Sequence, residues 1–166
     1  MPHCDWALLM PDRMNIVLVA PEIPHNTGAI GRVCVCLDAR LHLIHPLGFS
    51  LSEAHVRRAA LDYWEHIDIT EHASWENFME AETPSSMAFL SSRGTKTIYD
   101  TALNQASHLV FGNESSGLPH SLYGEYADNL CIIPMPGKHS RTLNLSNAVS
   151  VVAYECLRQG TIARSS

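Results

Sequence analysis

The stretch IIPMPGKHSRTLNLSNAVSVVAYE, residues 132–155, changes its pattern twice. Its start continues the apolar, β-prone run 131–133, which predicts a buried strand. Two prolines then end this strand, because proline has no N–H to donate to a sheet ladder. A loop with glycine and basic residues occupies 137–141, and from Leu145 the apolar residues recur with helical spacing. The stretch therefore predicts a strand, a polar loop and a long helix.

The predicted final helix carries an apolar face with small side chains beside it. The apolar face consists of Leu145, Ala148, Val149, Val152 and Cys156. The small side chains are Ser146, Ala148, Ser150 and Ala153, which favour close packing, and we expect a second copy of the chain there. Arg158 in the last turn and Gly160 just after it predict where the helix ends.

A strand that runs into a polar loop and then a helix is a common ligand-binding arrangement in open α/β sheets. The free N–H groups at the start of such a helix attract polar or anionic ligands. The alternative is a plain strand–loop–helix connection without a ligand, and this stretch alone does not separate the two.

Length and composition restrict the class of protein. A chain of 166 residues corresponds to one domain, and 46% hydrophobic with 17% charged residues is typical of a globular protein. The formal charge of −6 excludes a general polyanion binder of the histone kind. Any nucleic-acid partner must therefore be recognised by a local basic patch.

The cysteines and histidines carry no disulfide or metal-binding pattern. The five cysteines are an odd number without CxxC spacing, which indicates reduced residues of a cytosolic protein, most of them in apolar surroundings. The ten histidines show neither HExxH nor paired ligand spacing, so we expect no metal. No apolar run approaches the ~20 residues that span a bilayer, so we expect no membrane partner and a cytoplasmic protein.

Strands and helices are expected to alternate along the chain. The expected strands are 15–20, 41–45, a segment around 67–69, 87–90, 109–111 and 131–133. The expected helices are 26–37 with Asn26 or Thr27 as N-cap, 52–60, 75–81, 120–126 and the final helix, whereas 97–104 is irregular or weakly helical. In the second strand Leu41 and Leu43 point inward and His42 outward. This order predicts an α/β fold with a mostly parallel sheet flanked by helices.

One domain is expected over residues 14–160. Residues 1–13 lack the basic and long apolar regions of a signal peptide, and we interpret them as an N-terminal extension or an upstream-start artefact. Residues 161–166 form a short tail.

The usual fingerprints of nucleotide and hydrolase sites are missing. The sequence contains no GxGxxG after the first strand, no GxxxxGK[ST] and no GxSxG. What remains is three loops that bear glycine or proline and each follow a strand, at 91–94, 112–119 and 134–142. Such loops bring backbone N–H and C=O groups against a flat heteroaromatic ligand, because glycine permits a close approach and proline stiffens the loop.

Three segments resemble the motifs of the SPOUT class of RNA methyltransferases. They are NTGAIGR (26–32), FGNESSGLP (111–119) and IPMPGKHSRTLNLSNAVSVVAYE (133–155). PEIPHNTG (21–28) and LDY (61–63) make the likeness closest to the tRNA (cytidine/uridine-34) 2′-O-methyltransferase family. The resemblance covers about residues 14–160.

The resemblance implies a SPOUT-type α/β knot with a C-terminal trefoil knot, a homodimer, a tRNA substrate and S-adenosyl-L-methionine as methyl donor. It implies that the cofactor contacts fall on Leu90, Gly112, Ile133 and Thr142, many of them through the main chain. It implies RNA contacts at Lys138, Ser140 and Arg141, and catalytic roles for Asn26, Arg32, Glu114 and Asn144.

Each implied role has a simpler alternative. Arg32 is either a surface charge or the group beside the ribose 2′-oxygen, where it acts as the base or stabilises an alkoxide while water takes the proton. Glu114 either orients Arg32 or caps the turn that follows it. Asn144 and Thr142 open the final helix, so N-capping competes with ligand contact. The basic loop is either a phosphate site or simply solvated.

Some positions depart from the family pattern, and two other functions remain open. Ser116 replaces a common arginine, Thr142 replaces a serine, and His25 stands where a proline is common. The first alternative function is a SPOUT methyltransferase that acts on ribosomal RNA or on a base nitrogen. The second is a non-enzymatic α/β binding module.

Overall fold

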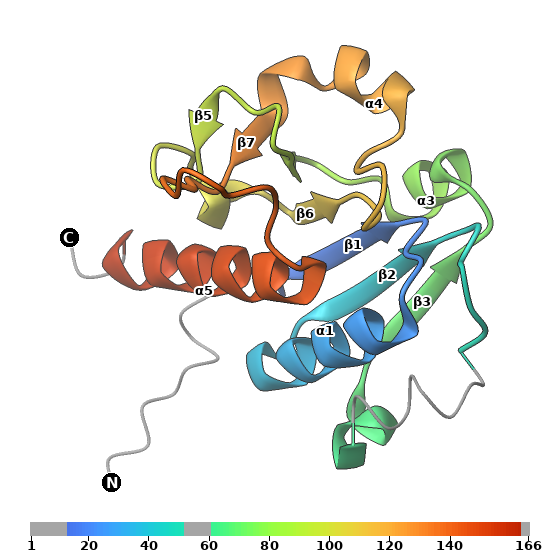
Figure 1. Ribbon diagram of the computed structural model, residues 1–166. Coiled ribbons are helices and arrows are strands. Elements are labelled where there is room, and N and C mark those ends of the chain that lie inside the picture. Colours follow the sequence, from blue (N-terminus) through green and yellow to red (C-terminus); the bar gives the residue numbers. More distant parts are fainter. Residues whose placement is uncertain (1–12, 52–60, 164–166) are drawn as a thin grey trace, which may run out of the picture.

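A computed structural model describes residues 13–51 and 61–163, and its centre is one seven-stranded sheet (Figure 1). The strands are β1 (Asn15–Val19), β2 (Arg40–Ile44), β3 (Ile69–His72), β4 (Met87–Leu90), β5 (Lys96–Thr97), β6 (His108–Phe111) and β7 (Leu130–Ile132). Their order across the sheet is β3-β2-β1-β6-β4-β7-β5, and every pairing is parallel. The predicted α/β fold with a parallel sheet is confirmed.

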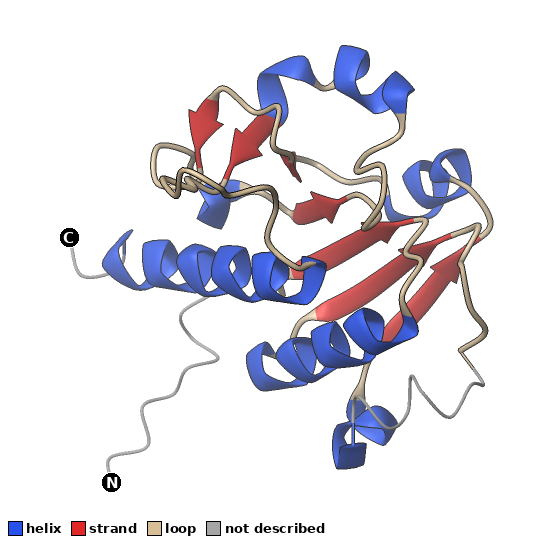
Figure 2. Cartoon of the chain, viewed as in Figure 1, coloured by secondary structure: helices blue, strands red, loops and turns tan. Residues whose placement is uncertain are grey.

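Helices cover both faces of the sheet (Figures 1 and 2). The α-helices are α1 (Pro24–Leu37), α3 (Trp75–Glu82), α4 (His120–Glu125) and α5 (Leu145–Ala163). Short 3₁₀ segments occur at η2 (Leu61–His66), η3 (Leu103–Gln105) and η4 (Ala127–Asn129). The helix expected over 52–60 lies outside the described residues.

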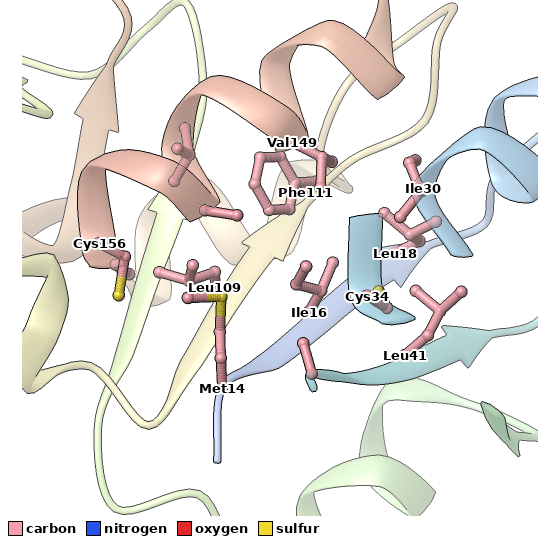
Figure 3. Close-up of a cluster of buried hydrophobic side chains, with 14 of the residues drawn as sticks. Met14, Ile16, Leu18, Ile30, Cys34, Leu41, Leu109, Phe111, Val149 and Cys156 are labelled. Atoms are coloured by element: carbon pink, nitrogen blue, oxygen red, sulfur yellow. The ribbon is translucent and has the colours of Figure 1, made fainter. Parts of the chain in front are cut away.

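The first core layer lies between the sheet and helices α1 and α5 (Figure 3). Ile16 and Leu18 of β1 point into it, because alternate residues of a strand face the same side. Ile30 of α1 and Val149 of α5 pack against them, and all four side chains are fully buried. The predicted apolar face of the final helix is therefore confirmed as a core surface.

The second core layer lies on the other face, under α3 and α4. Val17 of β1, Val110 of β6 and Phe78 of α3 belong to this layer, and all three side chains are fully buried. His42 also lies on this face and is fully buried, which corrects the prediction that it points outward. The alternation was predicted correctly, but in a parallel sheet covered on both faces neither side of a strand reaches water.

Several predicted boundaries are wrong. The two-residue β5 was not predicted, and Ile23 rather than Asn26 or Thr27 is the N-cap of α1. Helix α5 continues through Gly160, which is buried, to Ala163. Tertiary contacts on the core side keep this helix intact past a residue that often ends helices.

Arg13, which the sequence prediction assigned to the N-terminal extension, is bound to the folded domain. Its Nε donates to the Asp38 carbonyl at 2.7 Å, and its Nη2 donates to the Asp38 carboxylate at 2.9 Å. A second ion pair joins Arg13 to Asp68. Arg13 therefore joins the segment before β1 to the loop after α1.

Three of the five cysteines, Cys34, Cys131 and Cys156, are buried free thiols, whereas Cys36 is exposed and Cys4 lies outside the described residues. The prediction of mostly buried, reduced cysteines is thus confirmed for these three. Within 13–51 and 61–163 no helix is long and apolar enough to cross a membrane.

Candidate active site

A cavity of about 450 Å³ lies where the carboxyl ends of β4, β6 and β7 meet. The ends of parallel strands meet at one edge of the sheet, which is where ligands bind in open α/β folds. The loops 91–94, 112–119 and 134–142, singled out from the sequence, each contribute to its lining. The N-terminal ends of α1 and α5 complete it, with Ile23 and Asn26 on one helix and Leu145 and Ala148 on the other.

All four predicted cofactor residues line this cavity. Leu90 ends β4, Gly112 follows β6, Ile133 follows β7, and Thr142 precedes α5. They are far apart in sequence, and the sheet order brings them to one site because β6, β4 and β7 are adjacent.

Gly112 opens a tight loop, and its hydrogen faces that loop's own backbone. A Cβ built on Gly112 would lie 2.0 Å from the carbonyl carbon of Gly117. The Asn113 side-chain oxygen accepts hydrogen bonds from the N–H groups of Ser116 at 2.7 Å and Gly117 at 3.1 Å. We expected the glycine to make room for a ligand, but here it makes room for Gly117, whose φ of 74° itself favours glycine.

Glu114 caps the start of α1. Its carboxylate accepts hydrogen bonds from the backbone N–H groups of Glu22 at 2.8 Å and Ile23 at 3.3 Å. A negative group suits this position because the first N–H groups of a helix have no partner in the helix itself. In the structure this carboxylate binds the segment before α1 rather than the turn that follows it, and among the ion pairs of the described residues none joins it to Arg32.

A buried asparagine joins the three motifs. Asn26 is 3% exposed, and its Nδ2 donates to Glu114 Oε1 at 2.8 Å. Its Oδ1 accepts from Asn144 Nδ2 at 2.9 Å. These two bonds connect the start of α1 to the 112–119 loop and to the start of α5.

Asn144 also caps α5, as the sequence predicted. Its side-chain oxygen accepts from the N–H of Ser146 at 2.9 Å and from the Ser146 hydroxyl at 2.7 Å. One side chain therefore both ends the basic loop and contacts the cavity. Thr142 also lines the cavity.

Arg32 does not line the cavity. It is exposed on α1, and its guanidinium carbon lies 5.4 Å from the ring centroid of Tyr63, within cation–π distance. Tyr63 belongs to the LDY triplet, so two of the predicted segments meet here. The structure groups Asn26, Glu114 and Asn144 but leaves Arg32 apart from them.

The basic loop lies outside the cavity. Lys138, Ser140 and Arg141 are exposed. The Ser140 hydroxyl lies 2.7 Å from the Gly137 carbonyl and 3.1 Å from that of Met135, so it stabilises the turn. The two cationic side chains remain available for phosphate contact.

Sequence reasoning missed Tyr123. This residue of α4 lines the cavity, and its hydroxyl accepts a hydrogen bond from Ser91 Oγ at 3.2 Å. The Arg93 guanidinium carbon lies 4.5 Å from its ring centroid. A single tyrosine in a short helix carries no motif, so nothing in the sequence pointed to it.

Most of the sequence matches the profile of a known family. The profile of the SpoU rRNA Methylase family covers residues 13–154. The chain belongs to this SpoU methylase family.

Curated relatives within the family are tRNA methyltransferases. The chain is 48% identical over 147 residues to a tRNA (cytidine(34)-2′-O)-methyltransferase of Saccharophagus degradans, covering 87% of this chain and 94% of that protein. It is 44% identical over 147 residues to the protein of the same name from Escherichia coli K12, covering 88% and 93%.

Solved structures share the fold. A structure described as giving insight into the 2-OH methylation of C/U34 on tRNA superposes with a TM-score of 0.82 at 42% identity, covering 90% of this chain and 97% of that one. The SpoU methyltransferase AviRb of Streptomyces viridochromogenes, solved with the cofactor AdoMet, superposes with a TM-score of 0.78 at 24% identity, covering 89% and 58%. The second likeness concerns the fold alone.

Proposed function

We propose that this protein methylates the ribose 2′-hydroxyl of the wobble nucleotide, cytidine or uridine 34, of tRNA, with S-adenosyl-L-methionine as methyl donor. The observation that carries the proposal is the cavity at the joined ends of β4, β6 and β7, lined by all three family motifs. Relatives that share 44–48% of their residues with this chain carry the same activity in their names.

The cavity suits the methyl donor in size and lining. Its volume of about 450 Å³ falls in the range of small-molecule sites, ~300–1,000 Å³. Leu90, Ile133 and Leu145 offer apolar surface for a flat adenine ring, and the loop backbones offer donors and acceptors for the polar groups. We assign cofactor contacts to Leu90, Gly112, Ile133 and Thr142. When bound, S-adenosyl-L-methionine supplies an electrophilic methyl group.

Asn26, Glu114 and Asn144 act mainly by positioning. Their linked hydrogen bonds hold the ends of α1 and α5 on either side of the cavity. A ribose placed between these ends is aligned for in-line attack, and alignment alone contributes up to ~7–11 kcal/mol in favourable systems.

Arg32 acts from outside the cavity, on the helix whose start lines it. A guanidinium keeps its proton at neutral pH, so we assign it the stabilisation of the developing alkoxide, with water as the final proton acceptor. Its exposed position on the same helix as Asn26 leaves it free to meet an RNA substrate.

Lys138 and Arg141 bind backbone phosphates of the tRNA, next to the turn held by Ser140. This assignment rests on their exposure in the loop that leads to the cavity. The chain carries a net charge of −6, so the contact must be local.

We also propose a C-terminal trefoil knot, a homodimer and action in the cytoplasm, where tRNA is found. β7 lies between β4 and β5 in the sheet and pairs with both. Both of these strands precede β7 in the chain, and the placement of a later strand between two earlier ones supports a threaded chain path. For the dimer, Val151, Tyr154 and Ile162 of α5 are 40–52% exposed and recur at helical spacing. This proposed dimer surface differs from the predicted small-residue surface, because Ala153, one of the predicted residues, is buried in the core.

The decisive experiment is incubation of the purified protein with bulk tRNA and labelled methyl donor, followed by nucleoside mass spectrometry and mapping. We expect 2′-O-methylated cytidine or uridine at position 34. Methylation of a base nitrogen, or of ribosomal RNA alone, would support the first alternative function. No binding of the donor in calorimetry would support a non-enzymatic module.

A further inference from the structure

A cluster of imidazoles lies on the α3 face of the sheet, away from the cavity. His42 of β2, His72 of β3 and His108 of β6 are 0–5% exposed. His42 and His108 have their ring centroids 5.5 Å apart, and each lies within 5.7 Å of the Phe78 ring of α3. Glu82, the last residue of α3, brings a carboxylate to the same place.

Hydrogen bonds determine which nitrogen of His108 carries its proton. The Ser107 hydroxyl donates its single proton to the Ser86 carbonyl. His108 Nδ1, 2.9 Å from that hydroxyl oxygen, must therefore be the N–H donor. This leaves the lone pair on His108 Nε2, which is buried and has no hydrogen-bond partner. A buried acceptor without a partner is costly, and native proteins seldom keep one without a reason.

The same reasoning applies to His42. The Asn15 amide nitrogen donates to the carbonyls of Arg13 and Ser107, and this fixes the orientation of the amide. The atom that Asn15 turns toward His42 is therefore its oxygen, Oδ1, which is an acceptor. Oδ1 lies 3.3 Å from His42 Nε2, which must carry the proton. The lone pair of His42 is thus on Nδ1, the atom that lies 3.8 Å from Glu82 Oε1. An outer hydrogen bond that fixes the tautomer in this way is typical of histidines that bind metals.

We infer that His42, Glu82 and His108 form a binding site for a divalent transition metal such as Zn²⁺ or Co²⁺. One ligand atom from each residue lies within 4.8 Å of the others. In a tetrahedral Zn²⁺ site, bonds of ~2.0–2.1 Å place neighbouring ligand atoms ~3.3–3.5 Å apart, so small side-chain shifts suffice. The 3.8 Å between His42 Nδ1 and Glu82 Oε1 is too long for a direct hydrogen bond between these two atoms.

His72 lies next to the site, although it is not among the three residues whose ligand atoms all lie within 4.8 Å of one another. Its Nε2 lies 3.1 Å from His42 Nδ1 and 3.9 Å from Glu82 Oε1. This nitrogen donates a hydrogen bond to His42 Nδ1 in the structure.

The site has a structural role. It joins β2 and β6, which are separated by β1, to the end of α3. Glu82 is 23% exposed and gives an ion a path from solvent, whereas the imidazoles are closed off. The sequence could not indicate this site, because its ligands come from three elements rather than from one short motif.

The test is titration of the chelator-treated full chain with Co²⁺, followed by visible absorption, and with Zn²⁺, followed by calorimetry and thermal unfolding. We expect one ion per chain, tetrahedral Co²⁺ absorption and a higher Tm with Zn²⁺. Glu82→Gln and His108→Asn should each weaken binding more than ~tenfold and remove the Tm rise.

Glu71→Gln is the matched control, because Glu71 pairs with exposed His45 at 2.9 Å outside this cluster. It should bind like the unmodified chain. The inference is overturned when no saturable binding of one ion is seen, or when both cluster variants bind as tightly as the control. Should His108→Asn fail to fold, Glu82→Gln decides alone, because its side chain reaches solvent.

Discussion

At the scale of single residues, Asn26 has the most demanding position in the candidate site. It is buried, and both ends of its amide are used, one by Glu114 and one by Asn144. No isosteric residue offers a donor and an acceptor in this geometry. Its neighbour Thr27 is also buried, with a hydroxyl that has no partner among the described residues.

We expect Asn26→Ala to lower both stability and methyl transfer. The change leaves the Glu114 carboxylate and the Asn144 amide short of a partner, at a cost of ~1–3 kcal/mol in unfolding free energy. Chemical denaturation and tRNA methylation rates measure the two effects. Asn77→Ala is the control, since Asn77 is exposed on α3 and should tolerate the change. Equal behaviour of the two variants would contradict the bridging role.

We expect Arg32→Ala to abolish transfer while cofactor affinity stays nearly unchanged. The reason is that Arg32 lies outside the cavity but on the helix whose start lines it. A charge-stabilising group contributes ~10²–10³-fold to rate. Calorimetry with the methyl donor and single-turnover methylation separate the two effects. Near wild-type methylation by the alanine variant would show that Arg32 is a surface charge.

We expect the buried thiols to resist alkylation in the folded protein. Burial raises the pKa of Cys34 and Cys156 to about 12 and that of Cys131 to about 11, so none forms the reactive thiolate near neutral pH. Exposed Cys36 should react first. Iodoacetamide labelling of a Cys4→Ser variant, read by mass spectrometry before and after unfolding, checks this. Early labelling of Cys34 would contradict it.

At the scale of elements, the loop after β6 depends on close contact between its two ends. Asn113 and Gly117 form an antiparallel bridge, with N–H to carbonyl distances of 3.0 and 3.2 Å in the two directions. This turn aims Glu114 back at α1. Its shape therefore determines both the cavity wall and the helix cap.

We expect Gly112→Ala to destabilise the protein and weaken cofactor binding together. The added methyl would lie 2.0 Å from Gly117 backbone, so the loop must shift, at a cost of ~1–3 kcal/mol or more. Gly124→Ala is the control, because nothing lies within 4 Å of its added methyl on α4. That variant should be neutral or more stable by ~0.5–1 kcal/mol. Thermal unfolding and donor calorimetry measure both, and a harmless Gly112→Ala would contradict the loop geometry.

At the scale of the whole molecule, the acidic net charge repels RNA, whereas the basic loop attracts it. Only a local patch of positive charge can hold an RNA on a chain of formal charge −6. The exposed side chains of Lys138 and Arg141 lie in that patch.

We expect tRNA affinity to fall steeply with salt. Each phosphate contact adds ~0.7–0.9 to the slope of log K against log salt, so Lys138→Ala and Arg141→Ala should each reduce it by about that amount. Arg40→Ala is the control, because Arg40 pairs with Asp68 at 3.5 Å at the amino end of β2. Filter binding across a salt series provides the measurement. A slope unchanged in both loop variants would place the RNA elsewhere.

Sequence patterns predicted those features correctly that depend on interactions between residues close together in the chain. The apolar runs at β1, β4 and β6, the periodicity of α5 and the cap at Asn144 all follow from neighbours along the chain. The resemblance of the three motifs added the four predicted cofactor residues, which line one cavity. By contrast, β5 has two residues and no pattern of its own, and Gly160 is a stop signal only in a helix without tertiary support.

The sequence by itself determined the α/β class, most of the strands and the family of this protein, because these depend on residue type and spacing. Only the tertiary structure decided that Glu114 caps α1, that Asn26 joins two loops and that His42 turns to His108. These contacts join residues 66 or more positions apart. Their geometry depends on strand order and on helix packing, which no short window of sequence contains.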